Sequence, residues 1–142
     1  MGDHGVLVDS FDRFSGQSFS TLCQMYLAGF SGLHLRDNSH DNVRDYHQKV
    51  RSIFMKMDIP MRDLLIKNDT ANSEILVAWA NRMNICVEKI SFLEETVALP
   101  HQRWNWTLVI SAMVYLEALK QQASLLLENN GIEWCEESTP DE

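Results

Sequence analysis

The sequence predicts an all-α fold: a single-domain helical bundle with a central hydrophobic helix. Apolar residues recur at helical spacing in four long segments, and no segment alternates as a half-buried strand does. The chain has 142 residues, 45% of them hydrophobic, with only 6 Gly and 3 Pro, so it can bury a core of its own. We expect an N-terminal segment over residues 1–17, the helical domain over 18–135 and an acidic tail over 136–142.

The first long helix is predicted to begin after Ser18 or Ser20, because either side chain can cap the free N–H groups of a helix start. Its apolar face consists of residues three and four apart, namely Phe19, Leu22, Cys23, Tyr26, Leu27 and Phe30. Gly29 and Gly32 weaken its end, and the polar stretch 33–42 is expected to be a loop.

A second helix is predicted from Asp41 or Asn42, both good caps, to about Asp58. Its apolar face consists of Val43, Tyr46, Val50, Ile53, Phe54 and Met57. Because Pro60 disfavours the helical conformation of the residue before it, we expect this helix to stop near Asp58 and residues 61–68 to add one or two separate turns.

Two further long helices complete the bundle. The third is predicted to begin at a cap, Thr70 or Asn72, and to run to about residue 90. Its apolar residues are Ile75, Leu76, Trp79, Met83, Cys86, Val87 and Ile90. The fourth is predicted over about 102–128, with Gly131 as a left-handed stop.

The fourth helix contains a long stretch without charge, from Trp104 to Leu116. A helix that spans a membrane needs about 20 mostly apolar residues. This stretch has 13 and includes Asn105, Thr107 and Ser111. We therefore expect it to be buried in the bundle and not to anchor the chain in a membrane.

Composition and motifs exclude several classes of function. The formal net charge of −8 argues against a general nucleic-acid binder, which would carry a basic face. Three widely separated cysteines indicate a reduced, intracellular protein. The motifs for phosphate binding and nucleophilic catalysis are absent from the sequence, and none of the five histidines lies three or four residues from another. We expect no catalysis, cofactor or metal site, and favour recognition of a helix in a groove.

Several segments resemble the Bcl-2 family of survival proteins, in that family's order. YHQKVRSIFMKMDI, residues 46–59, is similar to the second helix of Mcl-type members, which also ends in a basic–apolar–Asp–Ile run. QSFSTLCQMYLAGFSG resembles the first helix, with Tyr26–Leu27 as its aromatic–Leu pair. LLLENNGIEW is similar to the second homology region, with Gly131 and Trp134 in its Gly and Trp positions.

Two segments compete for the family's first homology region, which reads Asn-Trp-Gly-Arg before an apolar run. NSEILVAW shares only Asn72 with it. Asn105–Trp106 matches literally but lies 47 residues beyond Asp58, nearly twice the expected separation, and leaves no room for the helix that follows the central one. The resemblance therefore places the central helix at 72–90 and makes 104–127 the next helix.

The resemblance implies an inhibitor of apoptosis that sequesters BH3 helices of pro-apoptotic proteins, Bim among them, in a hydrophobic groove. Small, divergent members of this fold are typical of large DNA viruses of the iridovirus and poxvirus type. The implied protein is viral and acts in the host cytoplasm without a membrane anchor. We also expect a homodimer, because four Trp and seven Met leave apolar surface to spare.

The implied groove lies between the second helix and helix 72–90. Its expected ligand-binding residues are Tyr46, Val50, Ile53, Phe54, Met57, Leu64, Leu65, Asn72, Leu76, Trp79 and Arg82. The family's Arg, which pairs with the Asp of the BH3 helix, is replaced by Ile75. Arg82 is the candidate substitute, although an exposed Arg82, or one paired with Glu88, is the favoured interpretation. The apolar members of the set suit a buried core as well.

Two other functions stay open. Poxvirus-type members of the fold have lost the groove and act as scaffolds that inhibit innate immune (NF-κB) signalling, and the degenerate first homology region fits that reading. An unrelated helical adaptor or oligomeric structural protein is the third. Binding of BH3 peptides separates the first function from the other two.

Overall fold

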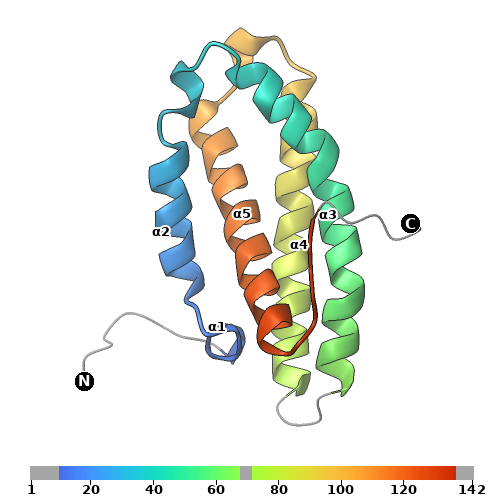
Figure 1. The fold of residues 1–142 in the computed structure, drawn as a ribbon. Helices are drawn as coiled ribbons and strands as arrows, with labels where there is room; N and C mark the ends of the chain where they lie inside the picture. The colour runs from blue at the N-terminus through green and yellow to red at the C-terminus, as the bar shows by residue number, and fades with distance from the viewer. Residues whose placement is uncertain (1–9, 68–71, 137–142) are drawn as a thin grey trace.

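A computed structural model describes residues 10–67 and 72–136 and confirms an all-α bundle (Figure 1). No strand occurs within these ranges. The α-helices are α1 (Ser10–Ser15), α2 (Phe19–Phe30), α3 (Ser39–Lys67), α4 (Asn72–Val97) and α5 (Trp106–Asn129). Two short 3₁₀ helices, η1 (Leu33–Leu35) and η2 (His101–Arg103), connect them. No helix in the described part of the chain has both the length and the apolarity to span a bilayer.

The central helix of the bundle is α5, which contacts each of the other four α-helices. Leu116, Leu119 and Leu126 are fully buried along its length. The expectation that residues 72–90 form the central helix is thus wrong. Because α5 has no charged residue before Glu117, neighbours can cover it on most sides, whereas α4 keeps a charged solvent face that includes Glu94.

The second predicted helix does not stop before Pro60, because α3 continues through it to Lys67. A proline inside a helix costs about 3 kcal/mol. Met61 and Leu65, on the far side of the proline, are 0% and 1% exposed, and burial of such side chains contributes about 1.5–3 kcal/mol each. Burial therefore offsets the cost of the proline.

The N-terminal segment belongs to the core from at least residue 10. Helix α1 packs against α4 and α5, and Phe11 is fully buried with its ring stacked on that of Trp79 at a centroid distance of 5.8 Å. The core therefore extends before residue 18, the expected start of the domain. Sequence periodicity missed α1 because six residues are too few to show a repeat.

Two helix ends follow the predicted chemistry, whereas α3 begins at Ser39, before the predicted caps Asp41 and Asn42. The Ser18 side chain caps α2 by accepting from Thr21 N, and Gly131 has φ +78° just after α5. The stretch 33–42 is only partly a loop, since it contains η1 and the start of α3. Helix α4 runs seven residues past the predicted end at 90, because Leu93 is also buried. Thr70, the Asn72 side chain and residues 137–142 lie outside the described residues.

Candidate helix-binding groove

Five of the eleven expected groove residues lie in the hydrophobic core. Val50, Phe54, Met57, Leu65 and Trp79 are each no more than 2% exposed. They fill the space that α3 shares with α4 and α5, so they present almost no surface to a ligand in this conformation. The apolar faces of α3 and α4 thus pack into the core, which is the alternative that the sequence also allowed.

Five further expected groove residues are partly buried, and the Asn72 side chain lies outside the described residues. Of these five, Leu64 and Leu76 pack against the core, and Ile53 is half-buried on α3. The Tyr46 hydroxyl donates a 2.6 Å hydrogen bond to Glu117 Oε2 of α5. Burial and the Glu117 carboxylate raise the pKa of Tyr46 well above its ordinary value, so the phenol stays protonated and remains the donor. Tyr46 thus links α3 to α5.

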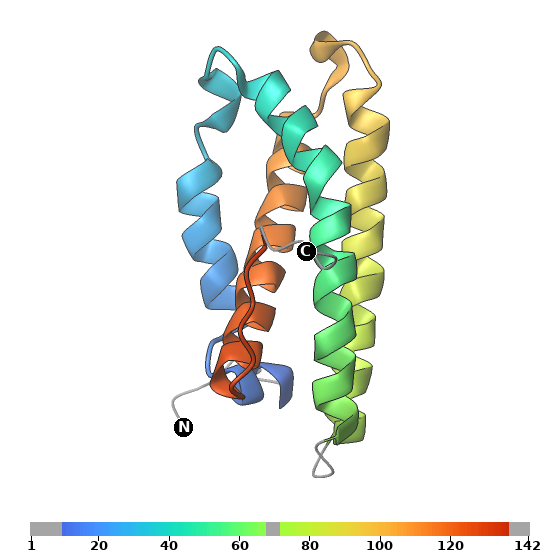
Figure 2. The same cartoon turned by 45° about the vertical axis from the view of Figure 1, so that its right-hand side comes forward.

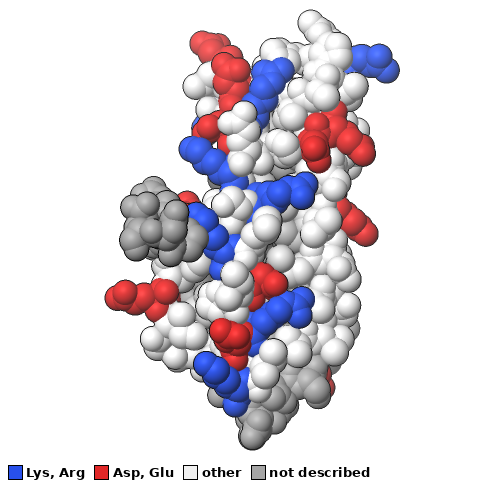
Figure 3. Space-filling model, turned by 90° about the vertical axis from the view of Figure 1, so that its right-hand side faces the viewer, with Lys and Arg blue, Asp and Glu red and all other residues white. Residues whose placement is uncertain are grey.

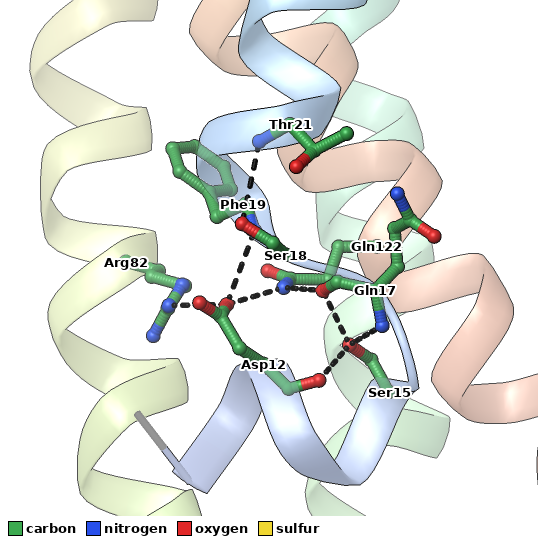
Figure 4. Close-up of polar contacts among 8 residues, drawn as sticks. All are labelled: Asp12, Ser15, Gln17, Ser18, Phe19, Thr21, Arg82 and Gln122. Carbon is green, nitrogen blue, oxygen red and sulfur yellow. Dashed lines mark hydrogen bonds and ion pairs between the residues drawn. The ribbon is translucent and has the colours of Figure 1, made fainter. Parts of the chain in front are cut away.

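Arg82 forms an ion pair with Asp12 of α1 (Figure 4). Its side chain is therefore neither exposed nor paired with Glu88, the two alternatives that the sequence left open. Its Nη2 lies 3.3 Å from Oδ1 of Asp12, and the two side chains are 13% and 8% exposed. The same Oδ1 accepts from Gln122 Nε2 at 2.7 Å and from the backbone N–H of Phe19 at 3.3 Å. One carboxylate oxygen therefore joins α1, α2, α4 and α5.

The outer face of α3 and α4 carries two hollows. Figure 3 shows Lys and Arg interspersed with Asp and Glu and with uncharged side chains along this face. The larger hollow, of about 410 Å³, lies beside Gln48, Ser52 and Ile59 and is lined by α3 alone, so it is not a groove between two helices. The hollow between the two helices, beside Met55 and Val87, has a volume of about 100 Å³. Ligand pockets usually enclose about 300–1,000 Å³, so this hollow is too small to seat the side chains of a helix.

A larger groove lies on the other side of the molecule, between α2 and α5. Residues 14–35, which include α2, contain no Lys, Arg, Asp or Glu, and residues 104–116 of α5 contain none either. The two helices pack closely on each other. Leu27 and Leu108 nevertheless remain 51% and 50% exposed. In a chain with net charge −8, two adjoining charge-free segments give a distinctly apolar surface.

The upper compartment of this α2–α5 groove has a volume of about 540 Å³. Its wall and floor are Cys23, Gln24, Leu27, Ser31, His34, Trp106, Thr107, Ile110, Ser111 and Val114. Burial raises the pKa of the Cys23 thiol, so this side chain contributes apolar surface and not a reactive thiolate. The compartment has the size and apolar character of a ligand site.

A lower compartment of about 360 Å³ continues the groove toward α4. Its lining is Phe19, Ala78, Asn81, Arg82, Ile85 and Tyr115. Thr107, Ser111 and Tyr115 lie four residues apart and share one face of α5; the first two line the upper compartment and Tyr115 lines the lower one. From Thr107 to Tyr115 the helix rises about 12 Å, or roughly two turns of a ligand helix.

Aromatic and imidazole rings close the upper end of the groove. The His40 ring stacks on that of His101 at 3.6 Å, and Trp106 lies 5.4 Å from His40. Arg44 Nη2 lies 2.8 Å from His101 Nε2. Because a guanidinium only donates, this contact requires a neutral His101 with its proton on Nδ1. Sequence patterns did not predict the stacked pair of His40 and His101, whose members lie 61 positions apart.

Other kinds of site find little support in the described part of the chain. No group of three or more His, Cys, Asp or Glu side chains there could hold a metal ion. Comparisons with protein-family models, curated proteins and solved structures yield no match. The groove is therefore judged on its own geometry.

Proposed function

We propose that this domain is a protein-binding module that captures an amphipathic helix in the α2–α5 groove, and that its ligand is a BH3-type helix of a pro-apoptotic protein. The observation that carries the recognition of a helix is the groove itself: two compartments along α5, lined by uncharged side chains and by Arg82 at the lower end. By holding such helices the protein inhibits apoptosis. The proposal involves no catalytic step.

The shape of the groove supports a helical ligand. Grooves of this kind take the apolar face of a helix through anchors at i, i+3, i+4 and i+7, which span about 10 Å. That length matches the two compartments. Arg82 lines the lower end and His34 the upper end, so an acidic residue of the ligand is best placed toward Arg82, where it shares that guanidinium with Asp12.

The resemblance to the Bcl-2 family would wall the groove with the family's second helix, which is α3 here, whereas α2 corresponds to the family's first helix. The proposal therefore keeps the family's type of ligand but moves the groove to the α2 side of α5, and it also moves the first homology region. Since α5 is the central helix, Asn105–Trp106 stands where the family has Asn-Trp, and the Asn105 side chain caps α5 by accepting from Leu108 N. Leu108 then takes the place of the family's Arg. On this alignment only the extended segment 130–136 follows the central helix in the described chain, and the second-homology-region match at Gly131 falls after it.

The test is a titration of the purified protein with labelled BH3 peptides, one of them from Bim. We expect saturable, submicromolar binding to at least one peptide. Leu27→Asp places a charge on the groove wall at a half-exposed position and should weaken binding by about tenfold or more. Ile59→Asp is the matched control, because Ile59 is 67% exposed on α3, away from the groove, and should bind as the unchanged chain does.

Val50→Asp, which an α3–α4 groove would favour as a test, is unsuitable because Val50 is fully buried and the variant would unfold. If no peptide binds a protein that is folded and helical by circular dichroism, the BH3 proposal fails. The function then moves to the groove-less scaffold that inhibits innate immune signalling. If Leu27→Asp and Ile59→Asp weaken binding equally, the ligand site is not the α2–α5 groove.

A further inference from the structure

The chain reverses direction directly after α5 and runs back along it (Figure 2). Gly131, with φ +78°, donates to the carbonyl of Glu128, and Ile132 donates to that of Leu127. This pair of bonds is the Schellman arrangement that ends helices at a left-handed residue. Residues 132–136, the strap, are extended and follow the α3 side of α5.

Two kinds of anchor hold the strap. Ile132 and Trp134 pack against the core, and their spacing of two places both on one side of an extended segment. Glu136 Oε1 lies 2.6 Å from Lys120 Nζ. From Asn129 back to Lys120 the helix rises about 14 Å, and four extended residues span about 13 Å. The strap therefore meets Lys120 at full extension.

The surface beneath the strap is a built polar site flanked by apolar contacts. The Lys120 side chain is only 16% exposed and also lies 3.0 Å from Glu117, which accepts from Tyr46. Burial alone would lower the pKa of Lys120, but the Glu136 and Glu117 carboxylates outweigh it and raise the pKa. The Lys120 ammonium lies beyond the two apolar contacts made by Ile132 and Trp134, so it selects a ligand whose carboxylate follows two apolar side chains.

The strap does not fill its surroundings. A hollow of about 470 Å³ remains beside Glu128, Glu133, Trp134 and Cys135. Cys135 is exposed, and the Glu136 side chain is 43% exposed. An extended segment held by two side chains and one ion pair, with open space next to it, has the features of a ligand that another chain can replace.

We infer that the cleft under the strap, between α3 and α5, is a second binding site, whose ligand is an extended peptide. That peptide carries two apolar residues at alternate positions and a carboxylate two residues after the second. Residues 132–136 occupy the cleft in cis and hold it closed until such a peptide displaces them. The cleft lies on a different face of α5 from the α2–α5 groove, so the inference does not depend on the proposed function.

The experiment is a titration with a synthetic peptide of residues 131–136, with serine in place of Cys135 and a fluorescent label. It compares the full chain with a full-length variant that carries Ile132→Ser, Trp134→Ser and Glu136→Gln. We expect saturable binding to the variant and binding at least about tenfold weaker to the unchanged chain, because the intact strap competes. Adding Lys120→Met to the variant should weaken binding by about tenfold.

Glu136→Gln alone keeps both apolar anchors and therefore the packing of the core. It should bind the peptide at least about threefold more tightly than the unchanged chain does, so the inference stays testable if the triple variant fails to fold. The inference is overturned if the folded triple variant does not bind the peptide. Equal affinity of the unchanged chain and of Glu136→Gln for the peptide also overturns the inference. So does an affinity of the triple variant for the peptide that Lys120→Met leaves unchanged.

Discussion

The Asp12 carboxylate offers the sharpest test of how the bundle is held together. Asp12→Ala removes one partner of an ion pair whose side chains are 8% and 13% exposed and leaves Arg82 without that carboxylate. Removing one partner of a buried pair costs about 3–5 kcal/mol. The Arg82 guanidinium keeps its positions 4.7 Å from the Phe11 ring and 5.6 Å from the Phe19 ring, which favours the lower part of this range.

The expected loss is therefore about 3 kcal/mol of the free energy of unfolding, from a total of about 5–15 kcal/mol for a typical domain. Urea unfolding followed by circular dichroism at 222 nm measures it, with an unchanged dependence on urea as the sign that both states keep their compactness. Asp45→Ala is the control, because its 3.0 Å pair with Lys49 is exposed on α3 and should contribute at most about 1 kcal/mol.

A double variant separates a lost charge pair from lost packing. Arg82→Met in the Asp12→Ala background removes the charge that has lost the Asp12 carboxylate and keeps most of the side-chain volume, so it should restore about 1–2 kcal/mol. If Asp12→Ala costs less than about 1 kcal/mol, or if the double variant is less stable than Asp12→Ala, the four-helix junction at Asp12 does not stabilise the fold in the way described.

Three further outcomes are expected. Trp79→Ala should cost about 3–5 kcal/mol in urea unfolding, because the side chain is fully buried, and a loss below about 1 kcal/mol would contradict the described core. Burial, His101 and Arg44 lower the pKa of His40 in the folded state, so the unfolded chain binds the proton more tightly. The contribution of His40 to stability should thus be complete above pH 6.5, its ordinary pKa, and should fall as the pH drops below that value. Thermal unfolding midpoints at pH 7.5 and 5.5 check this. His40→Asn should reduce the difference between the two midpoints. Gly131→Ala should cost about 1–2 kcal/mol through its positive φ alone, since the added Cβ meets no atom within 4 Å; an unchanged unfolding midpoint would argue against the left-handed stop.

The helices themselves were largely predictable, because helical periodicity and caps are local. Ser18 and Gly131 could be assigned from their neighbours alone. The extent of α3 could not be predicted in this way. Whether the helix continues through Pro60 depends on the burial of Met61 and Leu65 against other helices. The core that they enter is contributed by helices far along the chain.

The candidate site was harder to predict than the fold. An apolar helix face reads the same whether it meets a neighbour or a ligand, so Val50 and Trp79 could be assigned to a groove although both are buried. The α2–α5 groove brings together segments about 80 positions apart, such as Cys23 and Trp106. One signal was present in the sequence: residues 14–35 carry no charge, which is unusual for a helix with an exposed face.

The junction at Asp12 also fixes an order of events during synthesis. Its partner Gln122 lies 110 residues later, and Ser15 accepts from Asn129, 114 residues later. At about 5–20 residues per second, the ribosome needs roughly 5–20 s to supply these partners. Until then α1 can pack on α4, through the Phe11 ring and the Asp12 carboxylate, but not on α5. Helix α1 therefore reaches its full set of contacts only when α5 is complete, although it precedes α5 by about 90 residues.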